Sequence, residues 1–326
     1  MRILVIRLSS IGDVILTTPV LKEFKEKYPD SIIDFLVLDK FKDAIEGSPY
    51  VDNVILFKKG ENDGISNIVK FGKKLKENGY DYIFDLHAKA RSIIISGAIG
   101  VKTYRYKKRS WEKTILVKLK LSKYEVDNTI VKNYFGAFED FGLEYKGEDL
   151  NFPYSESDKD KVKEYVGHPV LAPGASKETK KWTPEGFGKL AKIIFEKYGV
   201  APIIIGSKDE RAICEKIREI SGNVAINLAG ELSLKESGAL LSQSKFLVTN
   251  DSGPFHIARG VKCKAYVIFG PTSPWMFDYD ENSILIYRKE SCSPCSLHGD
   301  KECPKGHFNC MKLLTPETVM QYIEKS

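Results

Sequence analysis

Short apolar runs alternate along this chain with longer stretches in which apolar residues recur every three or four positions. The short runs predict buried strands, and the periodic stretches predict amphipathic helices. We expect strands at Ile3–Leu8, Ile32–Leu38, Asn53–Phe57, Tyr82–Leu86, Val170–Ala172, Pro202–Ile205, Phe246–Thr249 and Ala265–Phe269. Strands that alternate with helices predict parallel sheets covered by helices on both faces.

Helical periodicity and one polar stretch divide the chain into two halves. The helices are expected at Val14–Lys27, Ile65–Asn78, Asn128–Phe141, Pro184–Tyr198, Asp209–Ile220 and Pro316–Lys325. The polar stretch is Pro153–Asp158, and 326 residues suffice for two domains. We therefore predict an α/β chain of two Rossmann-like, doubly wound domains, residues 1–155 and 156–326. The sequence leaves open whether the last helix packs back on the first domain.

Composition favours a soluble globular protein, with 42% apolar and 29% charged residues. No apolar run approaches the roughly 20 residues of a membrane-spanning helix. Asp13 interrupts the apolar N-terminus, which is therefore not typical of a signal peptide. We expect a cytoplasmic location.

The net charge of +6 is modest, but its distribution is uneven. Nine basic residues lie from Lys102 to Lys123, with Glu112 as the one acid among them. This segment is either a solvated helix face or a patch for an anionic partner. It also contains Trp111, one of several apolar residues at near-helical spacing. Such spacing is typical of a helix that lies on a membrane surface, or of a helix face that packs on the core. Nucleic acid is the less favoured partner, because no recognised module accompanies the basic run.

The first strand runs into the polar loop Arg7–Asp13, with Ser9, Ser10 and Gly12 inside it. No Gly-x-Gly-x-x-Gly motif and no P-loop follows this strand, which disfavours nicotinamide-binding and P-loop proteins. In open α/β sheets, ligands bind at the carboxyl ends of strands. Asp13 near a helix start is therefore either a helix cap or a general base.

Three strand-end loops of the second half predict a nucleotide site. The loop Asp251–Pro254 has the form of a strand–turn–helix phosphate site, in which Ser252 offers a hydroxyl and Gly253 an N–H group. Asp251 is better suited to sugar hydroxyls or to organising the loop. His256 is either a ligand or a core histidine.

The other two loops add a cation and an acid. Lys180 and Lys181 follow the loop Ala172–Ser176, and either lysine is a candidate to neutralise a diphosphate. The alternative is that both lysines are solvated side chains at the surface. The loop Ile205–Glu210 carries an acid suited to a ribose. If the first half holds the acceptor and the base, the two halves together have the arrangement expected of a sugar-nucleotide transferase of the GT-B type, in which two domains face a central cleft.

Several motifs together resemble one family. Arg7–Pro19 resembles the opening of the ADP-heptose:lipopolysaccharide heptosyltransferases, glycosyltransferase family 9, and of their heptosyltransferase II-like members in particular. Asn250–Pro254 and Phe269–Pro274 resemble the C-terminal signatures of that family, and Asp85–Ser92 resembles a first-domain segment. The similarity extends over essentially the whole chain.

The resemblance implies inverting transfer of L-glycero-D-manno-heptose from ADP-heptose to the inner core of lipopolysaccharide. The acceptor would be Kdo-lipid A or heptosyl-Kdo-lipid A, met at the inner face of the inner membrane, and catalysis would need no cofactor. By position, Asp13 is implied as the catalytic base. The implied donor-binding residues are Lys180, Glu210 (or Asp209), Asp251, Ser252, Gly253 and His256. The candidate acceptor-binding residues are Ser9, Ser10, Gly12, Arg105 and Arg109.

Four of the six cysteines form a group near the C-terminus: Cys292, Cys295, Cys303 and Cys310. Such spacing is compatible with a structural zinc ion, and His298 and His307 lie in the same segment. In a cytosolic protein, metal ligation and free thiols are favoured over disulfides. Structural zinc and reduced thiols are therefore both open.

Two other functions remain open. Asp251–Gly253 does not specify heptose, so a related transferase that uses another nucleotide sugar is an alternative. A non-catalytic nucleotide-binding protein at the membrane would use the same phosphate loops and the basic segment. Asp13 discriminates between the classes, because a binding module has no need of a base.

Overall fold

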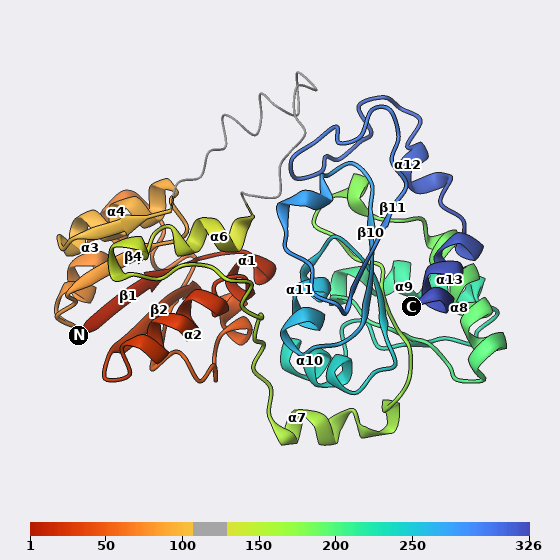
Figure 1. Cartoon of the computed structure of the whole chain (residues 1–326), viewed down its shortest axis with the longest axis horizontal. Coiled ribbons are helices and arrows are strands. Elements are labelled where there is room, and N and C mark those ends of the chain that lie inside the picture. Colours follow the sequence, from red (N-terminus) through yellow and green to blue (C-terminus); the bar gives the residue numbers. More distant parts are fainter. Residues whose placement is uncertain (107–128) are drawn as a thin grey trace. The chain divides into compact units, whose positions relative to one another are not determined.

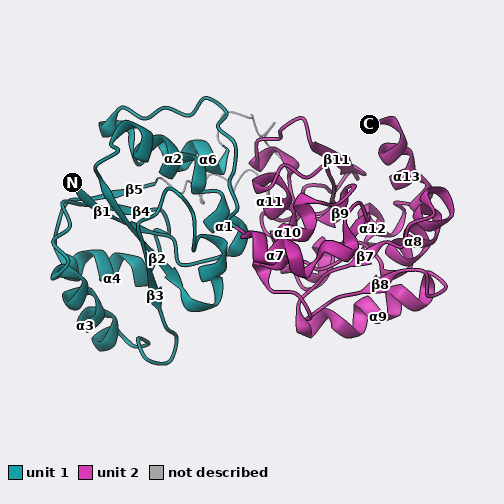
Figure 2. Cartoon of the chain, turned by 90° about the horizontal axis from the view of Figure 1, so that it is seen from below, with its two compact units in different colours: residues 1–109, 126–153 teal, residues 110–125, 154–326 magenta. Residues whose placement is uncertain are grey.

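The structure is a computed structural model of the chain, and it describes residues 1–106 and 129–326 (Figure 1). These residues form two compact units, which divide between Pro153 and Tyr154 (Figure 2). The first unit contains the described residues 1–106 and 129–153, and the second contains residues 154–326. The division lies next to the predicted boundary at residues 155 and 156.

The first unit is a five-stranded parallel sheet in the order β3-β2-β1-β4-β5. Its strands are β1 (Arg2–Ile6), β2 (Ile32–Leu38), β3 (Asn53–Phe57), β4 (Tyr82–Asp85) and β5 (Thr103–Arg105). Its described helices are α1 (Ile11–Ile15), α2 (Thr18–Lys27), α3 (Ile65–Lys76), α4 (Ala90–Ile99) and α6 (Ile130–Phe135). Every side chain from Ile3 to Ile6 is fully buried, as expected for a central strand covered on both faces.

The predicted helix Val14–Lys27 is divided into α1 and α2. Pro19 lies at the start of α2, where its missing N–H costs no helical hydrogen bond. The spacing of apolar residues continues across the break, because both helices bury apolar side chains in the interior of the unit. Val14 of α1 and Leu21 of α2 are examples.

The second unit is a six-stranded parallel sheet in the order β11-β10-β9-β6-β7-β8. Its strands are β6 (Val170–Ala172), β7 (Ile203–Ile204), β8 (Ile226–Asn227), β9 (Leu247–Asn250), β10 (Ala265–Phe269) and β11 (Ser283–Tyr287). Its helices are α7 (Glu156–Lys161), α8 (Pro184–Tyr198), α9 (Arg211–Ile220), α10 (Leu234–Ser242), α11 (Gly253–Gly260), α12 (Asn309–Lys312) and α13 (Pro316–Lys325).

The last helix packs within the second unit. Figure 1 shows α13 beside α8, and Val319 and Ile323 of α13 share one hydrophobic core with Leu190 and Ile194 of α8. The hydroxyl of Tyr266 in β10 donates a hydrogen bond to the carbonyl of Ile323. The apolar face of α13 is therefore packed on the second unit, a point that the sequence left open. Among the described residues, no helix is both long and apolar enough to cross a membrane.

Because every strand in each sheet is parallel, the loops that follow the strands gather at one edge of their sheet. In the first unit this edge carries the loops after β1, β2, β3 and β4. In the second unit it carries the loops after β6, β7, β9 and β10. Most candidate site residues lie in these loops or in the helices α1 and α11 that follow them, whereas Arg105 ends β5 and the cysteine group follows β11.

A pair of glycines tests the close contact of α3 and α4. A Cβ atom at Gly72 would lie 2.7 Å from Ala98 Cβ and 2.9 Å from the Ile95 carbonyl oxygen, whereas Gly97 has nothing within 4 Å. We expect Gly72→Ala to destabilise the unit by about 1–3 kcal/mol through overpacking. Gly97→Ala should be neutral or stabilising by up to about 1 kcal/mol, because alanine is the better helix former. Urea unfolding would measure both, and equal effects would contradict the close contact.

Candidate functional site

Asp13 lies in the first turn of α1, the helix that follows β1, where neighbouring residues fix its carboxylate. Its Oδ1 lies 2.7 Å from Arg7 Nη2, and its Oδ2 accepts hydrogen bonds from Ser10 N (2.9 Å) and Ser10 Oγ (2.8 Å). The Asp13 side chain is 30% exposed, so solvent-borne groups can reach it, whereas the Arg7 side chain is 7% exposed. Arg7 also donates to the carbonyl of Leu86 after β4, at 2.5 Å. Arg7 therefore joins two strand ends and fixes the carboxylate between them.

The surroundings of Asp13 lower its pKa. Burial alone would raise the pKa, but the charge of Arg7 and the hydrogen bonds from Ser10 outweigh burial. Asp13 is therefore ionised at neutral pH and able to accept a proton. It also has a local structural role, because Ser10 is the N-cap of α1 and Asp13 completes a capping box with it.

Two aromatic residues that the sequence did not single out surround Arg7. The Arg7 guanidinium lies 5.5 Å from the ring centroid of Tyr134, and the rings of Tyr134 and Tyr106 are 5.2 Å apart. Burial raises the pKa of Tyr134 well above its ordinary value, so the phenol stays neutral. The one local signal for this arrangement is a charged residue, Arg7, immediately after the apolar run Ile3–Ile6.

Arg105, a predicted acceptor ligand, is anchored at the end of β5. Its Nε donates to the fully buried Asp85 at 3.1 Å, and its Nη2 donates to Ser96 Oγ at 2.6 Å. The Arg105 side chain keeps 38% of its surface exposed. It is thus held by one side and accessible on the other, as a fixed cationic ligand would be. Arg109 lies outside the described residues.

The remaining predicted acceptor residues are Ser9 and Ser10, in the turn before α1, and Gly12, in α1 itself. Ser9 is half-buried and Ser10 is exposed, whereas Gly12 is buried inside α1. Gly12 therefore serves the close packing of α1, and the two serines offer the polar surface.

A cavity of about 410 Å³ that the sequence did not indicate lies beside the ends of β2 and β3. Its walls come from the last residue of each strand and from the residues that follow it. They are Leu38, Asp39, Lys40, Phe57, Lys58, Lys59 and Glu61. Three lysines against two acids give this cavity a net positive lining.

Lys180 and Asp251 form a buried ion pair in the second unit. Lys180 Nζ lies 2.6 Å from Asp251 Oδ2, and the two side chains are only 12% and 7% exposed. Asp251 follows β9, and Thr272, which follows β10, donates to the same Oδ2 at 3.0 Å. Lys180 ends the short 3-10 helix η5 (Glu178–Lys180). Lys181 instead pairs with Glu178 at the surface, so the structure distinguishes the two adjacent lysines.

Glu210 turns toward the loop after β6. Its Oε2 accepts hydrogen bonds from Ser207 N (2.8 Å) and Ser207 Oγ (3.0 Å). A Cβ atom at Gly174 would lie 2.2 Å from Glu210 Oε1, so only glycine allows this approach. Asp209 is exposed, which leaves Glu210 as the acid held against the neighbouring loop.

The N-terminus of α11 has the form predicted for a phosphate site. Ser252 is its N-cap, Gly253 its first residue, and Pro254 lies in its first turn. His256 is buried, with ring centroids 5.2 Å from Phe255 and 5.0 Å from Phe277. The structure thus gives His256 the aromatic surroundings of a core histidine close to the strand-end loops.

In the structure the cysteine group is not arranged as a zinc site, which was one of the two states that the sequence left open. Among residues 1–106 and 129–326, no three or more His, Cys, Asp or Glu side chains are arranged to hold a metal ion, and all six cysteines are free. Cys292 Sγ lies 3.8 Å from His307 Nε2. Cys310 is instead drawn into the hydrophobic core at α12, where burial raises the pKa of its thiol to about 12. Cys310 is thus buried, whereas Cys292, Cys295 and Cys303 are only partly buried.

Comparison with known proteins identifies the family. The model of glycosyltransferase family 9 (heptosyltransferase) matches residues 68–305, which begins after the Arg7–Asp13 loop. Lipooligosaccharide heptosyltransferase 2 of Haemophilus ducreyi is 28% identical over 348 residues, covering 100% of this chain and 99% of that protein.

Solved structures agree in fold. A family 9 glycosyl transferase from Veillonella parvula has a TM-score of 0.84 at 21% identity, covering 99% of this chain and 96% of its own. The E. coli heptosyltransferase WaaC with ADP-2-deoxy-2-fluoro heptose has a TM-score of 0.75 at 19% identity, covering 100% and 99%. The two parallel sheets and these likenesses give the chain the GT-B fold. The chain belongs to glycosyltransferase family 9, the heptosyltransferases.

Proposed function

We propose that this protein transfers L-glycero-D-manno-heptose from ADP-heptose to the inner core of lipopolysaccharide, with inversion at the anomeric carbon. The observation that carries the proposal is the family 9 match over residues 68–305. The relative from H. ducreyi is named a lipooligosaccharide heptosyltransferase, and the WaaC structure contains an ADP-heptose analogue. Both support this donor and this class of acceptor.

The acceptor hydroxyl must lose a proton as it attacks, and Asp13 is the residue suited to take it. Its carboxylate is ionised and partly exposed, and Arg7 and Ser10 fix its orientation. The acceptor oxygen forms a bond to the anomeric carbon while the bond to the diphosphate oxygen breaks. The proton passes to Asp13 and the electron pair leaves with ADP. One displacement of this kind inverts the anomeric centre without a covalent enzyme intermediate.

Negative charge grows on the diphosphate as ADP leaves, and the second unit supplies the groups that stabilise it. Lys180 would exchange its present partner, Asp251, for a phosphate oxygen. The N–H groups at Ser252 and Gly253, at the start of α11, are fixed donors for the other oxygens. Asp251 and His256 would then contact the heptose, and Glu210 the adenosine ribose.

An anionic acceptor fits the cationic groups at the edge of the first sheet. Inner-core acceptors carry carboxylate and phosphate groups, and the cavity beside β2 and β3 has Lys40, Lys58 and Lys59 in its walls. Arg105 adds an anchored, partly exposed guanidinium. A lipid-linked acceptor also supports a cytoplasmic protein that associates peripherally with the inner face of the inner membrane, with no nucleic-acid partner.

A donor panel tests the proposal. The purified chain is incubated with Kdo-lipid A or heptosyl-Kdo-lipid A and with ADP-heptose, UDP-sugars or GDP-sugars, and products are measured by mass spectrometry. We expect one heptose to be added from ADP-heptose alone. Transfer from UDP- or GDP-sugars without transfer from ADP-heptose would overturn the heptose assignment and favour the alternative nucleotide sugar. Binding of ADP-heptose with no transfer to either acceptor would favour a non-catalytic protein.

A further inference from the structure

The cysteine-rich loop, residues 292–310, is tied to the helix that carries Lys180. Thr179 lies next to Lys180 in η5 and is 3% exposed. Its N and Oγ1 both donate to the Asp300 carbonyl at 3.1 Å, and its Oγ1 accepts from Asp300 N at 2.8 Å. This set of hydrogen bonds, the Thr179–Asp300 clasp, joins two residues that are 121 positions apart.

The same loop touches the stem of Lys180 itself. Gly299 has φ of +78°, and a Cβ atom there would lie 2.7 Å from Lys180 Cγ and 3.0 Å from Lys180 Cδ. The loop backbone therefore lies directly against the methylene chain of Lys180. A lysine stem has four carbons and many rotamers, so such a contact restricts where the ammonium group points.

The other end of the loop is attached to the segment that supports Asp251, the partner of Lys180. Cys295 N and Ser296 N donate to the Pro271 carbonyl at 2.9 Å and 3.1 Å, and Ser293 Oγ donates to the Gly270 carbonyl at 3.0 Å. These carbonyls directly precede Thr272, which donates to Asp251. The cysteine-rich loop thus connects the segment that carries Lys180 with the segment that supports Asp251.

We propose that the cysteine-rich loop is a positioning element of the donor site, and that Thr179 is the positioning residue through which it orients Lys180 toward the donor diphosphate. This inference rests on the donor-binding role of Lys180 given above. A charged group must be held within fractions of an ångström to stabilise a leaving diphosphate. The clasp and Gly299 supply that constraint from a loop that holds no predicted reacting group.

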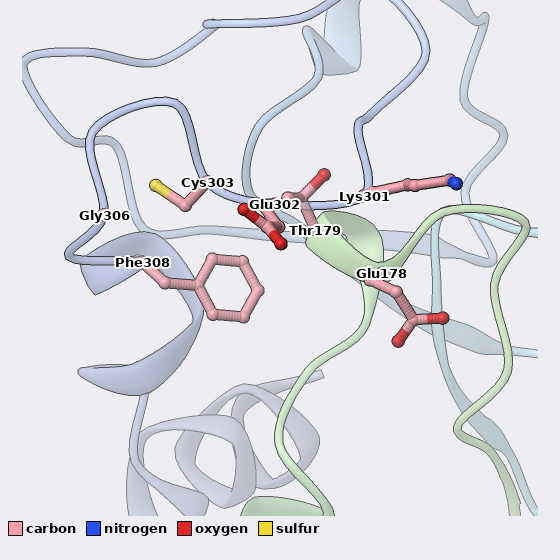
Figure 3. A pocket seen from close by; sticks show the side chains of 7 residues that line it. All are labelled: Glu178, Thr179, Lys301, Glu302, Cys303, Gly306 and Phe308. Atoms are coloured by element: carbon pink, nitrogen blue, oxygen red, sulfur yellow. The ribbon is translucent and has the colours of Figure 1, made fainter.

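A hollow beside the clasp gives η5 room to move when the clasp is broken. It measures about 360 Å³, and its walls come from η5 on one side and the cysteine-rich loop on the other (Figure 3). The lining residues are Glu178, Thr179, Lys301, Glu302, Cys303, Gly306 and Phe308. Since this space is not filled by protein, loss of the Thr179 hydroxyl should shift η5 rather than be absorbed by close packing.

A double-mutant cycle tests the inference, with ADP affinity of the full chain measured by isothermal titration calorimetry. Thr179→Val keeps the branched shape and removes the hydroxyl, and Thr179→Ser keeps the hydroxyl. We expect Thr179→Val to weaken ADP binding about 5- to 10-fold, and Thr179→Ser to stay within about twofold, since about one hydrogen bond of positioning is lost only in the first. In a Lys180→Met background, Thr179→Val should have no further effect, because the two residues act as one unit.

The outcomes separate this inference from the proposed function. An equal effect of Thr179→Val with and without Lys180 would mean that Thr179 acts on the fold alone, and would overturn the inference. Weaker ADP binding in Lys180→Met, with no effect of Thr179→Val, would overturn the inference and leave the proposed function standing. No effect of Lys180→Met would remove the donor role of Lys180 and overturn the inference, whereas heptose transfer itself is tested separately by the donor panel. If Thr179→Val does not fold, Gly299→Ala gives a parallel cycle, because its added Cβ would lie 2.7 Å from Lys180 Cγ. Its effect on ADP binding should vanish in the Lys180→Met background, where the backbone strain at φ +78° remains; an equal effect in both backgrounds would overturn the inference.

Discussion

Replacing Asp13 by asparagine is expected to reduce heptose transfer by about 10²–10⁴-fold, the range typical of a lost general base. Asparagine keeps the size of the side chain and can still face Ser10, but it cannot accept the proton of the attacking hydroxyl. ADP contacts the second unit in the proposed function, so its affinity should stay within about twofold of wild type. The measurement is the initial rate of transfer to Kdo-lipid A or heptosyl-Kdo-lipid A, beside calorimetric ADP binding.

Asp30→Asn is the matched control, because Asp30 is an exposed carboxylate shortly before β2, away from the strand-end loops. It should leave both transfer and ADP affinity unchanged. A comparison of thermal unfolding is also needed, because Asp13 completes the capping box of α1. Near-wild-type turnover in a folded Asp13→Asn variant would remove Asp13 from the mechanism.

The pH dependence gives a second measure of the same carboxylate. The pKa of Asp13 is lower in the folded protein than in a free aspartate. Above the ordinary aspartate pKa, Asp13 is therefore ionised and its ion pair with Arg7 is fully formed. Both are lost only when the pH falls through the lower pKa of the folded state. The acid limb of the transfer rate due to Asp13 should therefore lie below the ordinary aspartate range. Arg7→Met removes the opposing charge and should move that limb to higher pH.

Replacing Lys180 by methionine is expected to weaken ADP binding by about 10- to 100-fold, as for loss of a charge-assisted hydrogen bond to a phosphate. It should also lower the free energy of unfolding by about 3 kcal/mol, because Asp251 would remain buried without its counter-charge. Lys181→Met is the matched control, since Lys181 pairs with Glu178 at the surface, where an ion pair contributes little. Calorimetry and urea unfolding would measure the two effects separately.

The double variant Lys180→Met with Asp251→Asn separates binding from stability. Removing both charges should restore much of the lost stability, because no buried charge is left unpaired. ADP affinity should stay low, because the phosphate ligand is still missing. An ADP affinity like that of wild type in Lys180→Met would show that the pair is structural only.

The hydrophobic pattern was sufficient for most of the regular structure. The predicted bounds of β2, β3, β6, β10, α8 and α13 coincide with the observed ones. These segments are apolar runs, as short as the three buried residues of β6, or clear helical repeats with caps, so the local pattern identifies them. The strands β5, β8 and β11 were missed because they are short or only partly buried, and their pairing partners form them.

The sequence by itself determined the two parallel α/β units, the strand-end loops and the resemblance to family 9, because these depend on local periodicity and short motifs. Only the tertiary structure decided that Lys180 rather than Lys181 pairs with Asp251, that Arg7 holds Asp13, and that Cys310 enters the core. The Thr179–Asp300 clasp is likewise a contact that only the tertiary structure decided. The contacts of Lys180 and Thr179 join separate loops, which packing of the parallel sheet brings to the same edge. Arg7 and Asp13 lie in one segment, but a hydrophobic pattern does not encode how their side chains point.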